Sequence, residues 1–368
     1  MALPRLPGIQ ALRGIAITLV LMQHYAMAFP QAGAAVGSLS LWGGVDLFFA
    51  ISGFVISRSL LAGGAADRID GAMWRAFWIR RLCRLLPAAW TWLAISVALG
   101  FALAAFGHLQ PAAELRGAIA GAFGYANLFW ANCHASGTAA GCGLPQLTGS
   151  YWSLSLEEQF YALLATALLV MRLRTLAIVL LAGVLMLNAL PFHAFDLRWF
   201  LRIDALVLGV AVHALCRSTA SLRVAAIMRR HGLVAPVTLA LYVGIVCAPL
   251  ISARHPIGVI ALSAAGLVWM AACDHRGAAR MSRLSAVFGW LGERAYSIYL
   301  CHLPVLLVIH EMLWRAGGPA TLPGPWLAAA GLGSVVLILF VGTLSHRFLE
   351  QPGMQWGKRL TRPATRSI

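Results

Sequence analysis

Ten apolar runs divide this sequence, and each is long enough to cross a lipid bilayer. A transmembrane helix needs about 20 predominantly apolar residues. Such runs lie near residues 11–29, 41–61, 84–106, 156–171, 175–192, 199–215, 233–251, 257–273, 295–314 and 326–345. Because 60% of the residues are hydrophobic and only 11% are charged, a soluble domain of this length could not bury its apolar surface. The sequence therefore predicts an all-α polytopic membrane helix bundle with about ten transmembrane helices.

The basic residues orient this bundle. If the N-terminus is inside, the inner segments hold 23 of the 28 lysines and arginines. Cytoplasmic loops of membrane proteins carry such an excess, so both termini are predicted to be cytoplasmic, in a protein of the inner (cytoplasmic) membrane. The net charge of +16 is then explained by topology, and no nucleic-acid partner is predicted.

The membrane domain is predicted to cover residues 1–352, followed by a basic cytoplasmic tail at 353–368. Residues 112–131 are moderately apolar, but an eleventh span there would reverse every later loop and remove the charge asymmetry. They are therefore predicted to form an interfacial or re-entrant helix in a long outer loop. Cys133 and Cys142 of that loop could pair if the loop is extracytoplasmic, and the sequence leaves this open.

Ionisable residues inside a membrane are costly and usually mark function. Arg13 and His24 lie in the first run on one helical face, about 16 Å apart by helix rise. Asp46 enters from outside in the second run, GGVDLFFAISGF, and His24 is its nearest expected partner by depth. Close helix approach is expected at three small residues of this run, namely Gly43, Gly44 and Gly53.

The fourth run opens with YWSLSLEEQFY, which is expected to put Tyr151, Trp152, Glu157 and Glu158 at its outer end. An ordinary helix N-terminus within an aromatic belt would explain these residues. The alternative is an acceptor site, in which the aromatic rings stack on sugars and the acids stabilise a charged imidazole at His24. We favour the acceptor site, because ionisable residues at depth are expensive to keep.

Further polar residues lie in three other segments. In the sixth run, DLRWFLRIDALVLG, Arg198 and Arg202 are expected to share a helix face while Asp204 points elsewhere, so they should pair across helices or contact substrate. His302, in the ninth run, is expected only to pack. The segment FWIRRLCRLLP is expected to be an inner loop that either fixes topology or binds phosphates through Arg80, Arg81 and Arg84.

Together these segments resemble the acyltransferase family 3 of membrane acyltransferases. The matching segments run in family order from residue 9 to 352: IQALRGIAITLVLMQH, GGVDLFFAISGFVIS, FWIRRLCRLLP, YWSLSLEEQFY, LRIDALVLG, LGERAYSIYLCHLPV and SHRFLEQP. The resemblance implies ten core helices and transfer of an acyl group, commonly acetyl from acetyl-CoA, to hydroxyls of sugars or other envelope molecules. It implies that Arg13 and His24 are the family's functional pair. It also points to Asp46, Arg80, Arg81, Arg84, Trp152, Ser153 and Glu157.

This resemblance suggests a reaction path. Arg13, together with the three arginines of FWIRRLCRLLP, is predicted to hold the phosphates of acyl-CoA, the donor substrate. His24 is predicted to act as general base on the acceptor hydroxyl, with Asp46 or Glu157 orienting its ring. In a variant, His24 or another residue carries the acyl group briefly. Acceptor contacts are predicted for Tyr151, Trp152, Ser153, Glu158, Arg202 and Asp204, and no metal is predicted.

A transporter or flippase of a polar or glycan substrate is the alternative class, because it also places charges at depth. Such proteins commonly contain inverted repeats, and we find none in this sequence. The acceptor, the acyl chain and the oligomeric state stay open at this stage.

Overall fold

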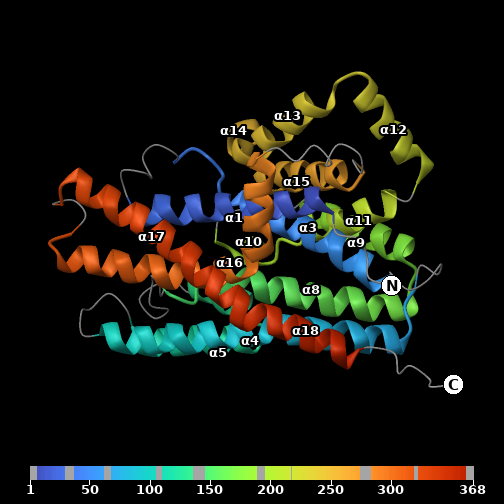
Figure 1. Ribbon diagram of the computed structural model, residues 1–368. Coiled ribbons are helices and arrows are strands. Elements are labelled where there is room, and N and C mark those ends of the chain that lie inside the picture. Colours follow the sequence, from blue (N-terminus) through green and yellow to red (C-terminus); the bar gives the residue numbers. More distant parts are fainter. Residues whose placement is uncertain are drawn as a thin grey trace.

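The computed structural model describes residues 6–29, 37–61, 68–104, 110–135, 146–188, 195–216, 218–273, 283–318 and 322–361. Within these ranges all regular structure is helical, which confirms the all-α part of the predicted fold (Figure 1). The first half contains α1 (Pro7–Ala28), α3 (Gly43–Leu60), α4 (Gly71–Leu103), α5 (Pro111–Ala122), α6 (Ala126–Ala135), α8 (Tyr151–Val170) and α9 (Leu173–Asn188). The second half contains α10 (Leu197–Phe200), α11 (Asp204–Leu215), α12 (Thr219–Arg230), α13 (Val234–Val246), α14 (Ala248–Ile251), α15 (Pro256–Cys273), α16 (Arg283–Arg315), α17 (Gly324–Ser345), the π-helix η3 (His346–Glu350) and α18 (Gln351–Leu360).

Six of the described helical segments are long and apolar enough to cross a membrane, so this is a multi-pass membrane protein. They are α1, α3, α4, α15, the segment Leu284–Arg315 of α16, and the continuous segment from α17 to α18. The other predicted spans coincide with α8, α9, the pair α10–α11, and α13 with α14. Of these, α9 and α13 are apolar but shorter than a full span.

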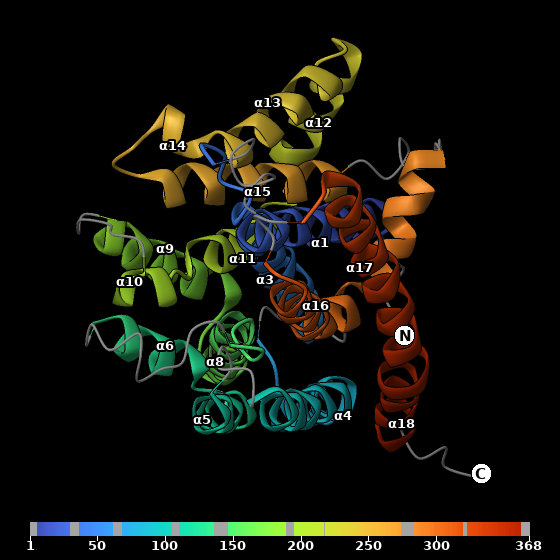
Figure 2. The ribbon, with the colours of Figure 1, turned by 90° about the vertical axis from the view of Figure 1, so that its left-hand side faces the viewer.

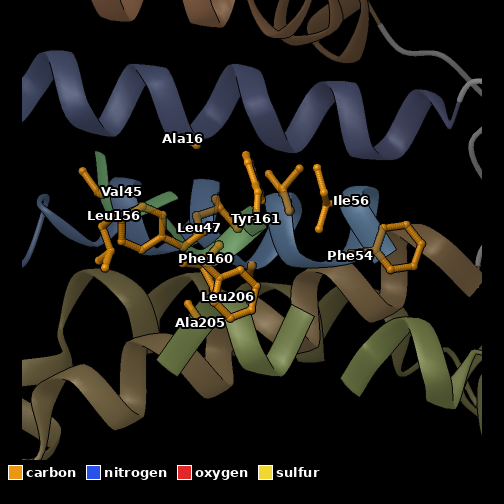
Figure 3. Packing of buried hydrophobic residues seen from close by; sticks show 14 of the residues in the cluster. Ala16, Val45, Leu47, Phe54, Ile56, Leu156, Phe160, Tyr161, Ala205 and Leu206 are labelled. Atoms are coloured by element: carbon orange, nitrogen blue, oxygen red, sulfur yellow. The ribbon is translucent and has the colours of Figure 1, made fainter. Parts of the chain in front are cut away.

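Helices α1 and α3 lie at the centre of the bundle. Seen along the bundle in Figure 2, α4 and α5 cover one side and α12–α15 the other, while α17 and α18 flank α16. Buried side chains of α1, α3, α8 and α11 meet in the core, where Leu47, Phe160 and Leu206 lie close together (Figure 3). Almost no solvent reaches these residues, so the centre is a packed core in which any buried charge needs a partner.

Glycines set the closest helix crossings. A Cβ atom added to Gly53 of α3 would overlap the backbone of Leu206 in α11, and one added to Gly44 would overlap the backbone of Ala16 in α1. Gly43 similarly approaches Ile245. The close approach predicted for the three glycines of the second run is therefore confirmed.

Helix α4 begins earlier than the sequence suggested. Asp70 caps it by accepting a hydrogen bond from the backbone N–H of Met73 at 2.7 Å. The helix then continues for 33 residues, or about 50 Å. The segment FWIRRLCRLLP is consequently helical and not an inner loop. The predicted helix start at residue 84 is too late because the charged residues of the basic cluster lower the local hydropathy.

The C-terminal part of the chain docks back onto α4. Gly353 and Gly357 of α18 lie directly against Cys83 and Arg80 of α4. The predicted boundary after residue 352 thus falls inside one continuous helical segment that packs on the bundle.

The stretch 112–131 is built as two helices and not one. Helix α5 packs along α4, α6 packs on α8 and α10, and Gly124 breaks the chain between them with a φ of +70°. Cys133 in α6 is disulfide-bonded, whereas Cys142 lies outside the described residues.

Candidate active site

Two arginines of α4 reach the middle of the bundle. Arg81 and Arg84 lie ten and thirteen residues after the first residue of α4, which is about 15–20 Å of helix rise. They therefore lie at the level of the acidic residues of α8 and not at the inner surface. The predicted separation between inner arginines and outer acids is wrong, because it assumed that α4 starts at residue 84.

Glu157 is the partner of Arg81. An Arg81 Nη2 to Glu157 Oε1 distance of 3.3 Å defines the ion pair, and the Ser52 hydroxyl donates to the same oxygen at 2.5 Å. The Arg81 guanidinium also lies 4.1 Å from the centre of the Tyr161 ring. Charge, hydrogen bond and aromatic face together hold the Arg81 head group in one place.

Glu350 holds Arg84 in the same way. Both Nε and Nη2 of Arg84 donate to Glu350 Oε1, at 3.2 and 3.0 Å. The other oxygen, Oε2, accepts from the Ser297 hydroxyl at 3.1 Å and lies 2.9 Å from His346 Nδ1. Glu350 is fully buried and ends the π-helix η3, an element that often marks functional sites. No role was predicted for the residues of SHRFLEQP, because the π-helix that buries Glu350 has no periodicity that can be read from sequence.

A cavity opens between these two ion pairs. Its polar lining is formed by Arg13, Ser52, Arg81, Arg84, Ser153, Glu157, Glu158, Tyr161, Tyr296 and Tyr299, and α3 supplies most of the apolar side. Arg80 is absent from this lining and lies against Gly357 of α18. Three of the four arginines predicted to hold the donor therefore meet in one cavity, together with both predicted acids of α8.

His24 is absent from this lining but is connected to its residue Tyr299 by two ring contacts. The ring of His24 contacts the ring of His302 on α16, with 4.8 Å between the centroids and 65° between the planes. Tyr299 contacts His302 in turn at 5.3 Å. His24 Nδ1 lies 2.9 Å from the backbone carbonyl of Val20, so Nδ1 carries the proton and Nε2 keeps a lone pair. His302, expected only to pack, is the ring beside the predicted base.

Asp46 is not the partner of His24. Its Oδ1 accepts from Arg202 Nε at 3.2 Å, and neither side chain is more than 1% exposed. The Arg202 guanidinium lies between three indole rings, at 4.1 Å from Trp199, 4.9 Å from Trp152 and 5.0 Å from Trp42.

Helix packing explains why Asp46 does not lie at the depth of His24, although the sequence predicted that it would. Gly44 packs against Val20, four residues below His24 on α1, and α1 and α3 run in opposite directions (Figure 1). Asp46 is therefore more than about 6 Å below His24. The predicted pairing across helices is confirmed for Arg202.

Most of the remaining predicted acceptor residues are hydrogen-bonded to other residues of the protein. The Tyr151 ring is 2% exposed and its hydroxyl donates to the Ala89 carbonyl at 2.8 Å, so it cannot stack on a sugar. Ser153 and the Tyr299 hydroxyl are hydrogen-bonded at 2.5 Å. Asp204 accepts from Asn188 at 2.6 Å.

Arg198 and Arg202 do not share a helix face, although the sequence predicted that they would. Helix α10 ends before Leu201 and α11 begins at Asp204, whereas the two helices were predicted as one.

This arrangement places a cavity lined by arginines two ring contacts away from His24. Guanidinium groups suit phosphates, and an imidazole with a free Nε2 suits proton abstraction from a hydroxyl. Among the residues that the structure describes, no group of three or more His, Cys, Asp or Glu could hold a metal ion. Fold and site thus define a membrane-embedded enzyme of the acyl-transferring class.

Comparison with known proteins identifies the family. Residues 6–344 match the profile of the acyltransferase 3 family, whose shared unit is an acyltransferase domain. The chain belongs to this family.

Three relatives align with nearly the whole chain. Peptidoglycan O-acetyltransferase OatA of Listeria monocytogenes is 26% identical over 94% of this chain and 55% of its own length. A provisionally named peptidoglycan O-acetyltransferase of Bacillus subtilis, YrhL, is 26% identical over 94% of this chain and 54% of its own length. A provisionally named membrane-bound transacylase of Komagataeibacter xylinus, BcsY, is 28% identical over 95% of this chain and 83% of its own length. The chain thus spans about half the length of the first two relatives. No solved structure matches it.

Proposed function

We propose that this protein is a membrane O-acyltransferase that moves an acyl group, acetyl in the first instance, from acyl-CoA to a hydroxyl of a cell-envelope glycan. The observation that carries the proposal is the cavity lined by Arg13, Arg81 and Arg84, whose lining residue Tyr299 contacts the His302 ring that packs on His24. The names of the relatives OatA and YrhL support peptidoglycan as the first acceptor to try.

In the proposed reaction, the arginines bind the CoA phosphates and the thin pantetheine arm follows the cavity toward Tyr299. His24 Nε2 takes the proton of the acceptor hydroxyl while the hydroxyl oxygen attacks the thioester carbonyl. The carbon–sulfur bond breaks, and the CoA thiolate leaves with the proton that His24 held. The sequence-based role for Asp46 is not retained, because Arg202 occupies its carboxylate. Glu157 instead holds Arg81 at the donor cavity.

Transfer of label tests the function directly. Protein in lipid vesicles, given acetyl-CoA labelled in the acetyl group and peptidoglycan fragments, should yield labelled fragments that mild base releases as acetate. A transporter or flippase would instead move unlabelled fragments across the vesicle membrane. That result, without any labelled product, would replace the enzyme by the alternative class.

Arginine substitutions test the donor cavity. Arg84→Gln or Arg81→Gln should raise the KM for acetyl-CoA about 10- to 100-fold, because each removes a charge-assisted phosphate contact of roughly 1.5–3 kcal/mol. Arg80→Gln is the matched control: it removes the same charge four residues from Arg84 but on the side facing α18, so the KM should change less than about threefold. Equal effects of all three substitutions would argue against the cavity as donor site.

We further propose that the chain crosses a bacterial inner membrane ten times with both termini in the cytoplasm. The charge asymmetry supports this, with α8, α9, α11 and α13 as the spans beyond the six that are both long and apolar enough.

The short helix α13 offers the sharpest topology test, because exposed residues flank it on both sides. Single cysteines replace His231 or Arg254 in a background without the five free cysteines. A membrane-impermeant maleimide should label position 254 in intact spheroplasts, and position 231 only after the membrane is opened. Labelling of both positions from one side would mean that α13 does not span.

A further inference from the structure

His302 carries an unsatisfied atom in the core of the protein. Its side chain is fully buried, and its Nδ1 lies 2.6 Å from the carbonyl oxygen of Tyr299, one turn earlier in α16. Nδ1 must therefore hold the ring proton and donate it. Among the described residues, Nε2 has no hydrogen-bond partner. A buried lone pair without a donor costs about 1–3 kcal/mol, which a leucine or phenylalanine packed at this position would avoid.

His24 is held by the same kind of backbone contact, and its ring packs on that of His302. Its Nδ1 is held by the Val20 carbonyl on its own helix, as that of His302 is held by Tyr299 on α16. The two rings meet edge to face at 4.8 Å between centroids. In both rings, then, a backbone carbonyl fixes the tautomer and leaves Nε2 unprotonated. Two neutral rings of this kind cannot hydrogen-bond to each other, but the pair can share one added proton.

We propose that His302 is the proton-sharing partner of His24 in acyl transfer, an inference that rests on the proposed function. When His24 Nε2 takes the proton of the acceptor hydroxyl, the new N–H can donate to His302 Nε2, and the imidazolium is stabilised without a carboxylate. The same proton then passes to the sulfur of the departing CoA, and both rings return to their neutral form. His302 thus fills the role that the sequence suggested for Asp46 or Glu157, whose carboxylates are bound to Arg202 and Arg81.

The helix packing suits this role. Helices α1 and α16 make the most extensive pairing in the fold, and a Cβ atom on Gly14 or Gly292 would overlap the backbone of the other helix. This close backbone crossing fixes α1 against α16 about ten residues before the two histidines, so both rings extend from helices held firmly together. His302 also follows Tyr299 along the chain, and Tyr299 lines the donor cavity, so the pair lies where a thioester threaded through the cavity would arrive.

Substitution of His302 tests the inference. His302→Gln keeps a buried acceptor of similar size but cannot take a proton, and we expect kcat to fall about 10-fold or more with the KM for acetyl-CoA unchanged. His302→Ala should lose more activity and regain part of it when imidazole is added, because free imidazole can occupy the vacated space. His213→Ala, which removes another buried imidazole packed on Phe54, is the control and should show no rescue.

The outcomes separate this inference from the proposed function. If His302→Gln keeps the parental kcat while His24→Gln is inactive, the pairing is wrong and the function stands. If both variants keep the parental kcat, His24 is not the base and the proposed mechanism falls. If His302→Ala folds but imidazole does not restore it, or if both His302 variants fail to purify as monodisperse protein, the role of His302 is structural and the inference is overturned.

Discussion

Replacing His24 by glutamine should reduce the kcat of acyl transfer by about 10²- to 10⁴-fold, the range for loss of a general base. Glutamine keeps the size and polarity of the side chain but cannot accept a proton at neutral pH. Insertion should be unaffected, because His24 lies near the end of α1 and its contacts with Val20 and His302 are local. The measurement is transfer of labelled acetyl from acetyl-CoA per mole of monodisperse protein.

Met22→Gln gives the matched control. Met22 lies two residues earlier on α1 and is 45% exposed, so this substitution introduces the same side chain away from the site and should leave kcat within about twofold. Turnover of His24→Gln near the parental value would remove the base from the mechanism. Label that stays on the parental protein in the absence of acceptor would instead favour the variant in which an acyl-enzyme forms.

The sequence predicted best what a single helix determines. Arg13 and His24 lie on α1 as their spacing required, and the glycines of α3 lie at helix crossings because small residues have few other uses there. These features depend only on helix geometry, which is the same in every bundle. The family segments were likewise readable as ordered motifs. The family match over residues 6–344 confirms the resemblance and covers all of these segments except SHRFLEQP, which begins at Ser345.

Pairings between helices could not be predicted in the same way. Depth was counted from the ends of apolar runs, and an error in one helix start moved Arg81 and Arg84 from the inner surface to the level of Glu157. Glu350 and Arg84 are 266 positions apart in the sequence, so the residues around either one do not predict their contact. Polar residues in a bundle find partners through the lateral arrangement of helices, which a one-dimensional hydropathy profile does not contain.

Replacing Asp46 by alanine should strongly destabilise the fold, because Asp46 pairs with the buried Arg202. Asp46→Ala leaves Arg202 charged and buried among three indole rings, without the carboxylate that pairs with its Nε. Loss of one member of a buried ion pair typically costs roughly 3–5 kcal/mol, since the other charge stays uncompensated. The measurement is the free energy of unfolding in mixed micelles, read from helix content during titration with a denaturing detergent.

A double variant tests whether the Asp46–Arg202 ion pair has a structural or a catalytic role. Asp46→Ala with Arg202→Met removes both charges, so it should be more stable than Asp46→Ala alone, and the two substitutions should be far from additive. If the pair only orders α3 against the chain around Arg202, the folded fraction of the double variant will keep kcat within a few-fold of the parent. A folded double variant with an unchanged KM for acceptor and a kcat reduced as far as that of His24→Gln would give Asp46 the catalytic role predicted from sequence. Because the ion pair lies more than a helix turn below His24 and faces the tryptophans, we expect the first result.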